Sequence, residues 1–376
     1  MSKSKVHILI ISSWYPNKKQ PFLGNFVQRQ ASLLSRNFEV TVVNTEYSET
    51  ESAQTVELTE QDGFKEVRVV HPRGKGLIER RKFLEKALDA GLDKVHNVDL
   101  VIGHVVIPKG LQFVQAKKYF NCPLILVEHA SYYRPEIRKD RSLVHKLILR
   151  KTRKKVDQIV AVSEFLRHDM HPDFQRHSIS VIGNHVDTRL FNYTPKKKSG
   201  VVKFLHVSTM DEKTKNPEGI LCACKGLKEN TSDFQLTIVC DEDVAQWKHL
   251  ATQFGLDDQI RFVGPLQWSE LLPYYHEADA FLLFSDYESF SIVLAEAWMT
   301  GTPAITTPVG IAHNMSKELG ILVDKGDKKM LASTMLDFIQ NGRDRFNNQL
   351  IANHGKHYSD DAILRQWTSL IEKHVG

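Results

Sequence analysis

Cysteine is scarce in this sequence, with four residues among 376. Four thiols are too few for the disulfide framework of a small secreted protein, which excludes that class. Cys222 and Cys224 are separated by one residue and no second pair follows them, which argues against a structural zinc site. The thiols are therefore expected to be small buried hydrophobic side chains in a reducing compartment.

Long apolar runs are also absent. A membrane-spanning helix needs about 20 consecutive apolar residues, and no stretch approaches that length. The apolar run at 6–12 follows two lysines, as in a signal peptide, but it contains His7 and no small-residue cleavage site precedes Trp14. A buried parallel strand fits this run better than a leader, so we expect a cytoplasmic protein. No Gly-x-Gly-x-x-Gly pattern follows the strand, which argues against an NAD-dependent enzyme.

The charge is unevenly distributed along the chain. Residues 1–200 contain 34 Lys and Arg against 21 Asp and Glu, whereas residues 201–376 contain 16 against 24. The basic excess peaks at 138–155, where Leu143, Val144, Leu147 and Ile148 recur at helical spacing. A basic amphipathic helix can contact an anionic membrane, and the alternative is an ordinary surface helix with a solvated basic face. No nucleic-acid recognition motif accompanies the charge, so nucleic acid is not an expected partner.

Continuous Val, Ile and Leu runs alternate with helical patterns through the whole chain. Such runs are typical of parallel strands that are covered on both faces of a sheet. The predicted strands lie at 6–12, 39–45, 99–104, 123–129, 157–163 and 179–184, and then at 202–208, 234–240, 259–264, 280–285, 303–307 and 320–324. The pattern restarts after a polar segment at 191–200, which is the predicted linker.

Two domains are expected, because single cores stop growing near ~250–300 residues. The prediction is an α/β protein with two doubly wound, Rossmann-like domains, at 1–192 and 200–358, facing a central cleft. The amphipathic helix at about 360–376 is expected to pack back on the first domain. Ligands of such sheets bind beyond the carboxyl ends of the strands.

The most informative stretch is 280–310, which is predicted to form a strand, a loop, a helix and a second strand. The helix should begin near Ser289–Ser291 and end at Gly301. The loop before it lies at the carboxyl end of a strand and leads into a helix N-terminus, where free N–H groups favour an anion such as phosphate. Glu288 precedes this helix and Glu296 lies within it; the alternative for Glu296 is a carboxylate on the helix surface.

Glu288 and Glu296 are separated by seven residues and followed by Ala297, Gly301 and Pro303. This arrangement resembles the Glu-x7-Glu signature of glycosyltransferase family 4, the retaining group 1 glycosyltransferases with the two-domain GT-B fold. The resemblance implies that Glu288 contacts the hydroxyls of the donor sugar and that Glu296 binds the ribose hydroxyls of its nucleotide.

The same resemblance implies that the backbone around Phe290, Ser291 and Ile292 holds the donor diphosphate. The family commonly has Gly-Phe-Gly at this point, whereas this chain has Ser289-Phe290-Ser291. The serines add Cβ atoms where glycine leaves the backbone open to close approach by a ligand.

A second loop, at 209–216, is expected to lie at the carboxyl end of the strand at 202–208. A lysine there can neutralise negative charge on a leaving diphosphate. The family usually has an Arg early in this loop and a Lys just before Asn or Gly; this chain has Thr209 at the first position and Lys215 at the second. Lys213 is a further candidate ligand, or else a solvated loop lysine.

The opening segment at 12–30 resembles the Trp-Tyr-Pro … Gly-x-Phe-Val start of one branch of the family. The resemblance implies that Gly24 and Asn25 lie near the donor phosphates and the acceptor; the alternative for Gly24 is a structural turn glycine. Gly264 is expected near the nucleotide base on the same grounds.

His129 ends the predicted strand at 123–129, and relatives have a His at this position that contacts the donor sugar. A lone His is more often structural, but a strand end favours a ligand contact. Glu128 is predicted to orient His129, and Arg134 is predicted to contribute charge to acceptor binding.

The predicted function is retaining transfer of a hexose-type sugar from a nucleotide diphosphate sugar to a glycan or lipid-linked acceptor, in synthesis of a cell-surface polysaccharide such as lipopolysaccharide or capsule. Glu288, His129 and Lys215 are the expected catalytic residues. The resemblance implies that no cofactor and no essential metal take part. Two alternatives stay open at this point: a sugar-nucleotide 2-epimerase or hydrolase, and a sugar-binding protein without catalysis.

Overall fold

The computed structural model describes residues 5–17, 20–50, 53–196, 200–241 and 243–375. The chain forms two compact α/β units. The first contains residues 1–162, 166–184 and 364–376, and the second contains residues 163–165 and 185–363. Each unit is built on its own mainly parallel sheet, which confirms the predicted fold class.

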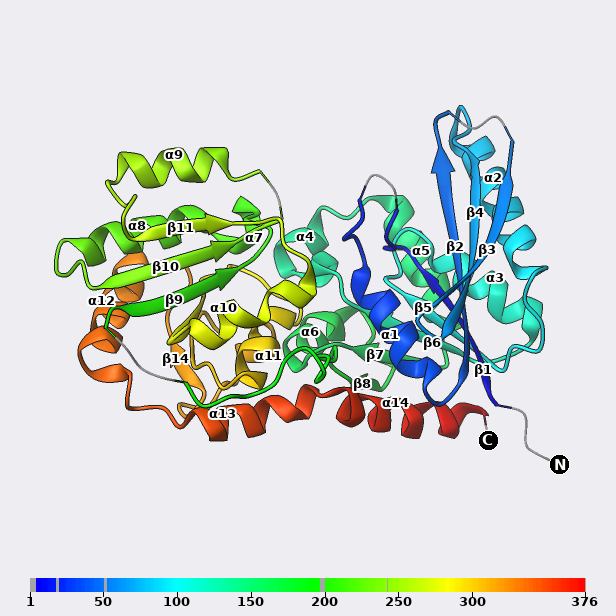
Figure 1. The fold of residues 1–376 in the computed structure, drawn as a ribbon. Coiled ribbons are helices and arrows are strands. Elements are labelled where there is room, and N and C mark those ends of the chain that lie inside the picture. Colours follow the sequence, from blue (N-terminus) through cyan, green and yellow to red (C-terminus); the bar gives the residue numbers. More distant parts are fainter. Residues whose placement is uncertain (1–4, 18–19, 51–52, 197–199, 242, 376) are drawn as a thin grey trace. The chain divides into compact units, whose positions relative to one another are not determined.

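The sheet of the first unit has eight strands in the order β3-β4-β2-β1-β5-β6-β7-β8 (Figure 1). All six strands predicted here are present, and only β3 runs antiparallel to its neighbour. The bounds are β1 (His7–Ser12), β2 (Glu39–Ser48), β3 (Thr55–Gln61), β4 (Phe64–Pro72), β5 (Leu100–His104), β6 (Leu124–Glu128), β7 (Gln158–Ala161) and β8 (Ile179–Val181).

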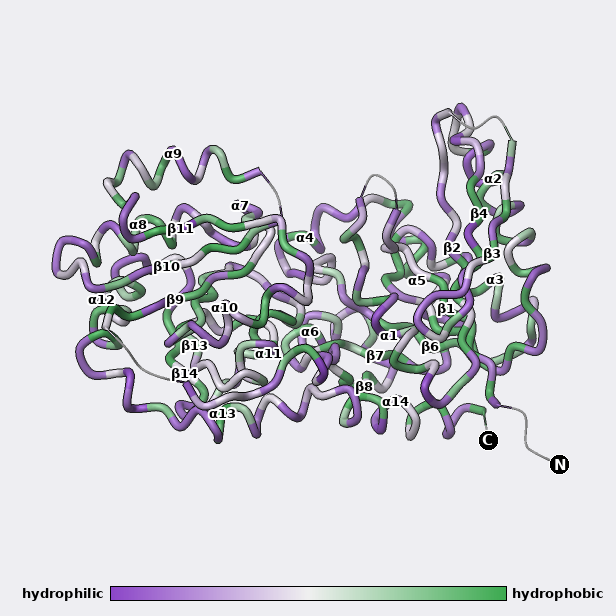
Figure 2. The backbone as a smooth tube through the Cα atoms, viewed as in Figure 1, coloured by the Kyte–Doolittle hydropathy of each residue, from purple (hydrophilic) through white to green (hydrophobic). Residues whose placement is uncertain are grey.

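Hydrophobic side chains explain why β1, β5 and β6 lie at the centre of this sheet. Every residue of β1, β5 and β6 is buried, as expected for strands covered on both faces. Figure 2 shows hydrophobic residues along these strands and more hydrophilic ones on the connecting segments. Gly103 of β5 leaves room for Phe113, because a Cβ atom on Gly103 would lie 2.4 Å from that ring.

Helices cover both faces of the first sheet. α3 packs against β5 on the face that Gly103 opens, and α5 packs on α3, while α1 lies on the opposite face. The helices of this unit are α1 (Asn25–Ser35), α2 (Leu77–Leu92), α3 (Gly110–Phe120), α4 (Pro135–Lys139), α5 (Leu143–Arg153) and, from Leu166 onward, α6 (Glu164–Met170). Residues from 364 onward in α14 (Asp360–Val375) belong to this unit, where Thr368 accepts a hydrogen bond from the side chain of Asn37.

The hairpin formed by β3 and β4 is the main element that our sequence analysis did not predict. Its turn consists of Asp62 (φ 40°) and Gly63 (φ 87°), the left-handed backbone that a tight hairpin requires. Most residues of β3 are exposed, so the strand lacks the apolar run by which the other strands were identified.

The sheet of the second unit has six parallel strands in the order β11-β10-β9-β12-β13-β14. All six were predicted: β9 (Val202–Val207), β10 (Phe234–Val239), β11 (Ile260–Val263), β12 (Ala280–Leu283), β13 (Ala304–Thr306) and β14 (Gly320–Leu322). The helices are α7 (Glu212–Lys215), α8 (Pro217–Lys228), α9 (Ala245–Gln253), α10 (Leu272–Glu277), α11 (Ile292–Met299), α12 (Lys328–Asp337) and α13 (Asn348–Gly355). Short 3₁₀ turns at Trp268–Glu270 (η3) and Gly310–Ala312 (η4) complete the part of this unit that forms the site.

The predicted linker at 191–200 is partly anchored to the second unit. The ammonium of Lys196 donates hydrogen bonds to the carbonyls of Tyr275 (2.8 Å) and Ala278 (2.9 Å), and burial lowers its pKa to about 7. Residues 197–199 lie outside the described residues. The division between the units falls at 184/185, a few residues before this segment.

The cysteines form no disulfide. Cys122, Cys224 and Cys240 are buried and Cys222 is half-buried, all as free thiols. Within the described residues, no helix combines the length and apolarity that crossing a bilayer requires.

Candidate active site

The second unit brings Lys215 and Glu288 together. The ammonium nitrogen of Lys215, at the end of α7, lies 2.6 Å from Oε1 of Glu288, which precedes α11. The residues are 73 positions apart in sequence, and they meet because β9 and β12 are neighbours whose carboxyl ends share one edge of the sheet. Glu288 is 9% exposed, so this is a largely buried ion pair.

The loop that carries Glu288 is held on two sides. The hydroxyl of Ser285 donates to Oε1 of Glu288 (2.9 Å), and the amide of Asp286 donates to the carbonyl of Thr214 (2.8 Å). Gly310 of η4 lies so close that a Cβ atom there would be 2.4 Å from the carbonyl oxygen of Phe290. Both hydrogen bonds described for the Glu288 carboxylate end on Oε1, which leaves Oε2 for a ligand.

The segment from Ser289 to Ile292 forms the N-terminus of α11. Ser291 is the residue before the helix, as predicted, and Ile292 is its first residue. The carbonyl of Ser289 accepts a hydrogen bond from the hydroxyl of Ser163 (2.5 Å), and the carbonyl of Phe290 accepts one from the amide of Ile311 (3.0 Å). The first amide hydrogens of α11 therefore lie directly after the Lys215–Glu288 pair in the chain, where an anion would be stabilised.

Glu296 is deeply buried, at 1% exposure, so the alternative of a helix-surface carboxylate is wrong. Its Oε1 accepts a hydrogen bond from the indole nitrogen of Trp268 (2.7 Å) and its Oε2 accepts one from the hydroxyl of Tyr275 (2.8 Å). Neither partner was predicted. Trp268 and Tyr275 both donate to Glu296, so they fix its carboxylate in position. The contact of Glu296 with a ribose stays a prediction.

His206, the last but one residue of β9, supports the loop that follows the strand. Its Nδ1 donates to the carbonyl of Leu282 (2.9 Å), so Nε2 accepts from the hydroxyl of Ser208 (2.7 Å). Burial lowers the pKa of His206 to about 4, so the ring is neutral. The Ser208 oxygen in turn accepts from the amide of Met210 (3.0 Å), and this shapes the backbone at Thr209.

The remaining residues predicted for the second unit are less constrained. Lys213 is exposed and the described residues give its side chain no partner, in contrast to Lys215. Gly264 has φ 121° and lies against the end of β10, because a Cβ atom there would be 2.1 Å from the carbonyl oxygen of Cys240. A packing reason for glycine therefore exists at this position without any ligand.

In the first unit, His129 contacts a second histidine. Nε2 of His129 lies 3.1 Å from Nδ1 of His104, the last residue of β5, and the ring of Phe26 stacks on His129 at 4.0 Å between centroids. Burial and the neighbouring His104 hold the pKa of His129 well below its usual range, so both rings are neutral. His104 was not predicted, although a polar residue at the carboxyl end of a buried strand is a readable signal.

Glu128 does not orient His129, which corrects our prediction. Glu128 is the last residue of β6 and His129 follows the strand, where its ring contacts His104 and Phe26. Oε1 of Glu128 accepts hydrogen bonds from the amide of Val106 (2.9 Å) and the hydroxyl of Tyr133 (2.8 Å). Burial raises the pKa of Glu128 to about 7.

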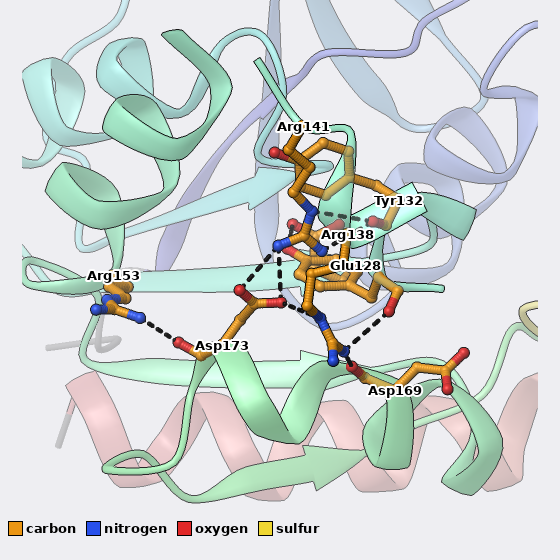
Figure 3. Close-up of polar contacts among 8 residues, drawn as sticks. Glu128, Tyr132, Arg138, Arg141, Arg153, Asp169 and Asp173 are labelled. Carbon is orange, nitrogen blue, oxygen red and sulfur yellow. Dashed lines mark hydrogen bonds and ion pairs between the residues drawn. The ribbon is translucent and has the colours of Figure 1, made fainter. Parts of the chain in front are cut away.

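The basic segment at 138–155 is partly structural. Arg141 donates two hydrogen bonds of 2.8 Å to the carboxylate of Asp173, and Arg138 and Arg153 donate to the carbonyls of Asp169 and Asp173 (Figure 3). These arginines tie the segment to residues 169–173. The Nε atom of Arg134, the residue predicted to bind the acceptor, lies 3.4 Å from Oε2 of Glu136.

The helix predicted from the spacing is present as α5, and one of its faces packs on the protein. Ile148, Leu149 and Thr152 are buried. Leu143, Val144 and Leu147 instead lie on the exposed side, at 83%, 57% and 40% exposure.

Gly24 has a structural role in the first unit. Its φ is 70°, and a Cβ atom there would lie 2.3 Å from the carbonyl oxygen of Trp14, so only glycine fits. Asn25 begins α1, and its side chain has no partner within the described residues. Whether either residue touches a ligand stays a prediction.

An Asp-x-Asp spacing, which can hold a divalent cation, occurs once after β10, at Asp241 and Asp243. Asp243 accepts a hydrogen bond from the amide of Ala245 at the start of α9 (2.9 Å), and Glu242 between them lies outside the described residues. Among the described residues, no three His, Cys, Asp or Glu side chains are grouped so that they could hold a metal ion. The expected metal independence rests on the family resemblance and stays a prediction.

Comparison with known proteins identifies the family. The profile of "Glycosyl transferases group 1" matches residues 193–357, and that of "Glycosyltransferase Family 4" matches residues 23–190. The chain belongs to the group 1 glycosyltransferases of glycosyltransferase family 4. The two profiles match the second and the first unit in turn, so the family assignment extends over nearly the whole chain.

Curated relatives match over part of their length. A D-inositol 3-phosphate glycosyltransferase of Corynebacterium efficiens is 33% identical over 130 residues, which cover 33% of this chain and 30% of the relative. The amylovoran biosynthesis glycosyltransferase AmsK of Erwinia amylovora is 32% identical over 155 residues, 38% of this chain and 37% of the relative. The chain thus spans about a third of the length of these relatives.

The fold matches solved structures over the full chain. Sucrose-phosphate synthase from Thermosynechococcus elongatus superimposes with a TM-score of 0.79 at 18% identity, covering 98% of this chain and 99% of that one. The two α/β units of this family 4 member therefore have the GT-B fold.

Proposed function

We propose that the protein is a retaining glycosyltransferase that moves a hexose-type sugar from a nucleotide diphosphate sugar to a glycan or lipid-linked acceptor. The observation that carries the proposal is the Lys215–Glu288 pair beside the N-terminus of α11. It places a cation, a carboxylate with a free oxygen and a helix N-terminus within one loop system, which suits a sugar diphosphate.

The proposed chemistry uses positioning and charge stabilisation. The bond between the anomeric carbon and the diphosphate oxygen breaks while the acceptor oxygen bonds to the same face of that carbon, and the acceptor proton passes to the leaving phosphate. Lys215 and the amides at the start of α11 stabilise the negative charge that develops on the diphosphate. Oε2 of Glu288 accepts a hydrogen bond from a sugar hydroxyl. No carboxylate is assigned as a nucleophile, and no metal or cofactor is part of the proposal.

His129 is proposed to contact the donor sugar as a neutral hydrogen-bonding group, since its pKa lies well below the usual range. Its Nε2 is engaged by His104, so Nδ1 is the ring nitrogen left for the sugar. We also propose a role in cell-surface polysaccharide synthesis. The name of the amylovoran biosynthesis relative and the basic character of the first 200 residues support it.

Nucleotide binding gives the first test. The chain is expected to melt at a higher temperature with one of UDP, GDP and ADP, because a ligand that binds only the folded state stabilises it by ~2.7 kcal/mol at 100 times its Kd. The matching rise in Tm is about 5–10 °C for a unit of this size. Lys215→Met is expected to abolish most of that rise, whereas Lys317→Met, at an exposed site in the same unit, serves as the control.

A flat response to all three nucleotides and their sugars would contradict the proposal. Tight binding of a free sugar without nucleotide binding would favour the sugar-binding alternative. Product analysis separates the remaining alternative: release of epimerised or free sugar from the donor at full rate, without acceptor, would identify an epimerase or hydrolase.

Contact with an anionic membrane is proposed through the exposed face of α5. Leu143, Val144 and Leu147 project from this face beside the exposed cations Lys146 and Arg150. Solvation of a basic helix explains its exposed cations but not its three exposed apolar side chains. Contact with an anionic membrane explains both features, because the apolar side chains insert between lipid headgroups and the lysines and arginines lie over anionic lipid. The cytoplasmic location expected from the sequence is part of this proposal.

Vesicle sedimentation tests the membrane contact. The chain is expected to bind phosphatidylglycerol-containing vesicles and not pure phosphatidylcholine, and added salt should weaken binding. Leu143→Ser with Val144→Ser should reduce binding at least ~10-fold, because two apolar side chains lose their burial. Ile78→Ser is the control, since Ile78 is 76% exposed on α2. Equal loss in the control would contradict a specific role for α5.

A further inference from the structure

Ser291 has a backbone conformation that serine rarely adopts. Its φ is 76° and its ψ is 80°, in the left-handed region, where Cβ crowds the adjacent carbonyl oxygen. Glycine takes this conformation without cost, and the resemblance described above leads one to expect glycine here. A side chain at this position is therefore retained against a conformational penalty.

The hydroxyl of Ser291 is also unsatisfied. The residue is 6% exposed, and its Oγ has no hydrogen-bond partner in the described structure. Serine before a helix normally accepts a hydrogen bond from one of the first amides, but Ser291 makes no such bond to α11. A buried hydroxyl without a partner is unfavourable and calls for an explanation.

Neighbouring residues hold the backbone of Ser291 in its left-handed conformation. The carbonyl of Phe290 is fixed by the amide of Ile311 at 3.0 Å, and Gly310 lies against the same carbonyl. Three residues before Ser291, Glu288 is held by Lys215. The strained residue thus stands at the start of α11, between the Lys215–Glu288 pair and the first amides of the helix, where the helix dipole favours an anion.

We infer that the hydroxyl of Ser291 is itself a ligand of the donor diphosphate. It donates its hydrogen to a phosphate oxygen next to the oxygen bound by the first amides of α11. The inference rests on the proposed function, because it assumes that the diphosphate of the donor binds at the N-terminus of α11. It explains both unfavourable features at once: the hydroxyl finds its acceptor only when the diphosphate is present, and a residue with a Cβ atom is required to carry it.

Ser291→Gly separates this role from a structural one, because the two roles predict different results. Loss of the hydroxyl should weaken nucleoside diphosphate binding about 10-fold to 100-fold, the range for one hydrogen bond to a charged group. Removal of the strain should at the same time raise the Tm of the free protein. Ser291→Ala should weaken binding equally, but it retains the strain and should melt below Ser291→Gly.

The measurement is calorimetric titration with the nucleoside diphosphate that most raises the Tm of the wild-type chain, with melting curves of each variant. Asn121→Gly is the matched control: it relieves a left-handed φ of 50° at the end of α3 and should leave nucleotide affinity unchanged. A Ser291→Gly protein that binds within about twofold of wild type would overturn this inference alone. Failure of the wild-type chain to bind any nucleoside diphosphate would overturn it together with the proposed function.

Discussion

Replacing Glu288 by alanine is expected to lower kcat at least ~100-fold, the loss typical of one contact that stabilises a transition state. Two effects combine in this variant. The sugar hydroxyl loses the acceptor Oε2, and Lys215 loses the carboxylate that holds its ammonium 2.6 Å away. Transfer rates measured at saturating donor and acceptor would report the first effect. A displaced lysine would also weaken binding of the diphosphate, which appears in the KM for the donor.

Glu288→Gln distinguishes charge from shape at this position. The amide keeps the length of the side chain and one oxygen that can accept from Ser285, but it lacks the charge that fixes Lys215. A loss close to that of the alanine variant would assign the effect to charge. Glu318→Ala, at an exposed position of the same unit, is the control for general damage. Near-normal turnover in a folded Glu288→Ala protein would remove Glu288 from the reaction.

Most strands could be predicted because they are buried on both faces of a sheet, and such strands have continuous apolar runs in the sequence. All twelve predicted strands are present. The β3–β4 hairpin was missed because β3 is largely exposed at the sheet edge and has no such run. Its signal was of a different kind: Asp62-Gly63 is the dipeptide that a tight hairpin turn favours.

The sequence and the family resemblance predicted the elements on which the candidate site residues lie. Glu288 precedes α11, Glu296 lies within that helix and Lys215 ends α7, whereas their roles toward a ligand stay predictions. Contacts between distant segments were not readable from the sequence. The pairing of His104 with His129 depends on the adjacency of β5 and β6, and the indole of Trp268 reaches Glu296 from 28 residues away.

The spacing of Leu143, Val144, Leu147 and Ile148 predicted a helix but not which of its faces packs on the protein. The structure buries Ile148 and exposes the other three. The prediction for Glu128 was wrong: Glu128 is the last residue of β6, and its carboxylate accepts from Val106 and Tyr133 and does not contact the imidazole of His129.

Glu296→Ala is expected to destabilise the second unit as well as weaken nucleotide binding. Glu296 is buried between two donors, the indole of Trp268 and the hydroxyl of Tyr275. The variant removes the carboxylate that accepts from the indole of Trp268, while the Tyr275 hydroxyl can still reach the carbonyl of Val293 at 3.2 Å. A hydrogen bond to a charged group contributes about 1.5–3 kcal/mol, and the cavity left by the side chain adds to the loss, so Tm should fall by several degrees.

Glu296→Gln provides the sharper comparison, because an amide can still pair with both neighbours of Glu296. Its oxygen can accept from the indole of Trp268, and its NH₂ group can donate to the hydroxyl oxygen of Tyr275, whose hydrogen then turns to the carbonyl of Val293. The glutamine variant should therefore lose clearly less stability than the alanine variant. Trp268→Phe in the Glu296→Gln background should lower the Tm further, because the amide oxygen then loses its donor. Melting curves of the three variants, with Glu318→Ala as the control, test this order. An unchanged Tm in Glu296→Ala would mean that the carboxylate does not hold these two side chains. The predicted ribose contact would then have to be judged on nucleotide affinity alone.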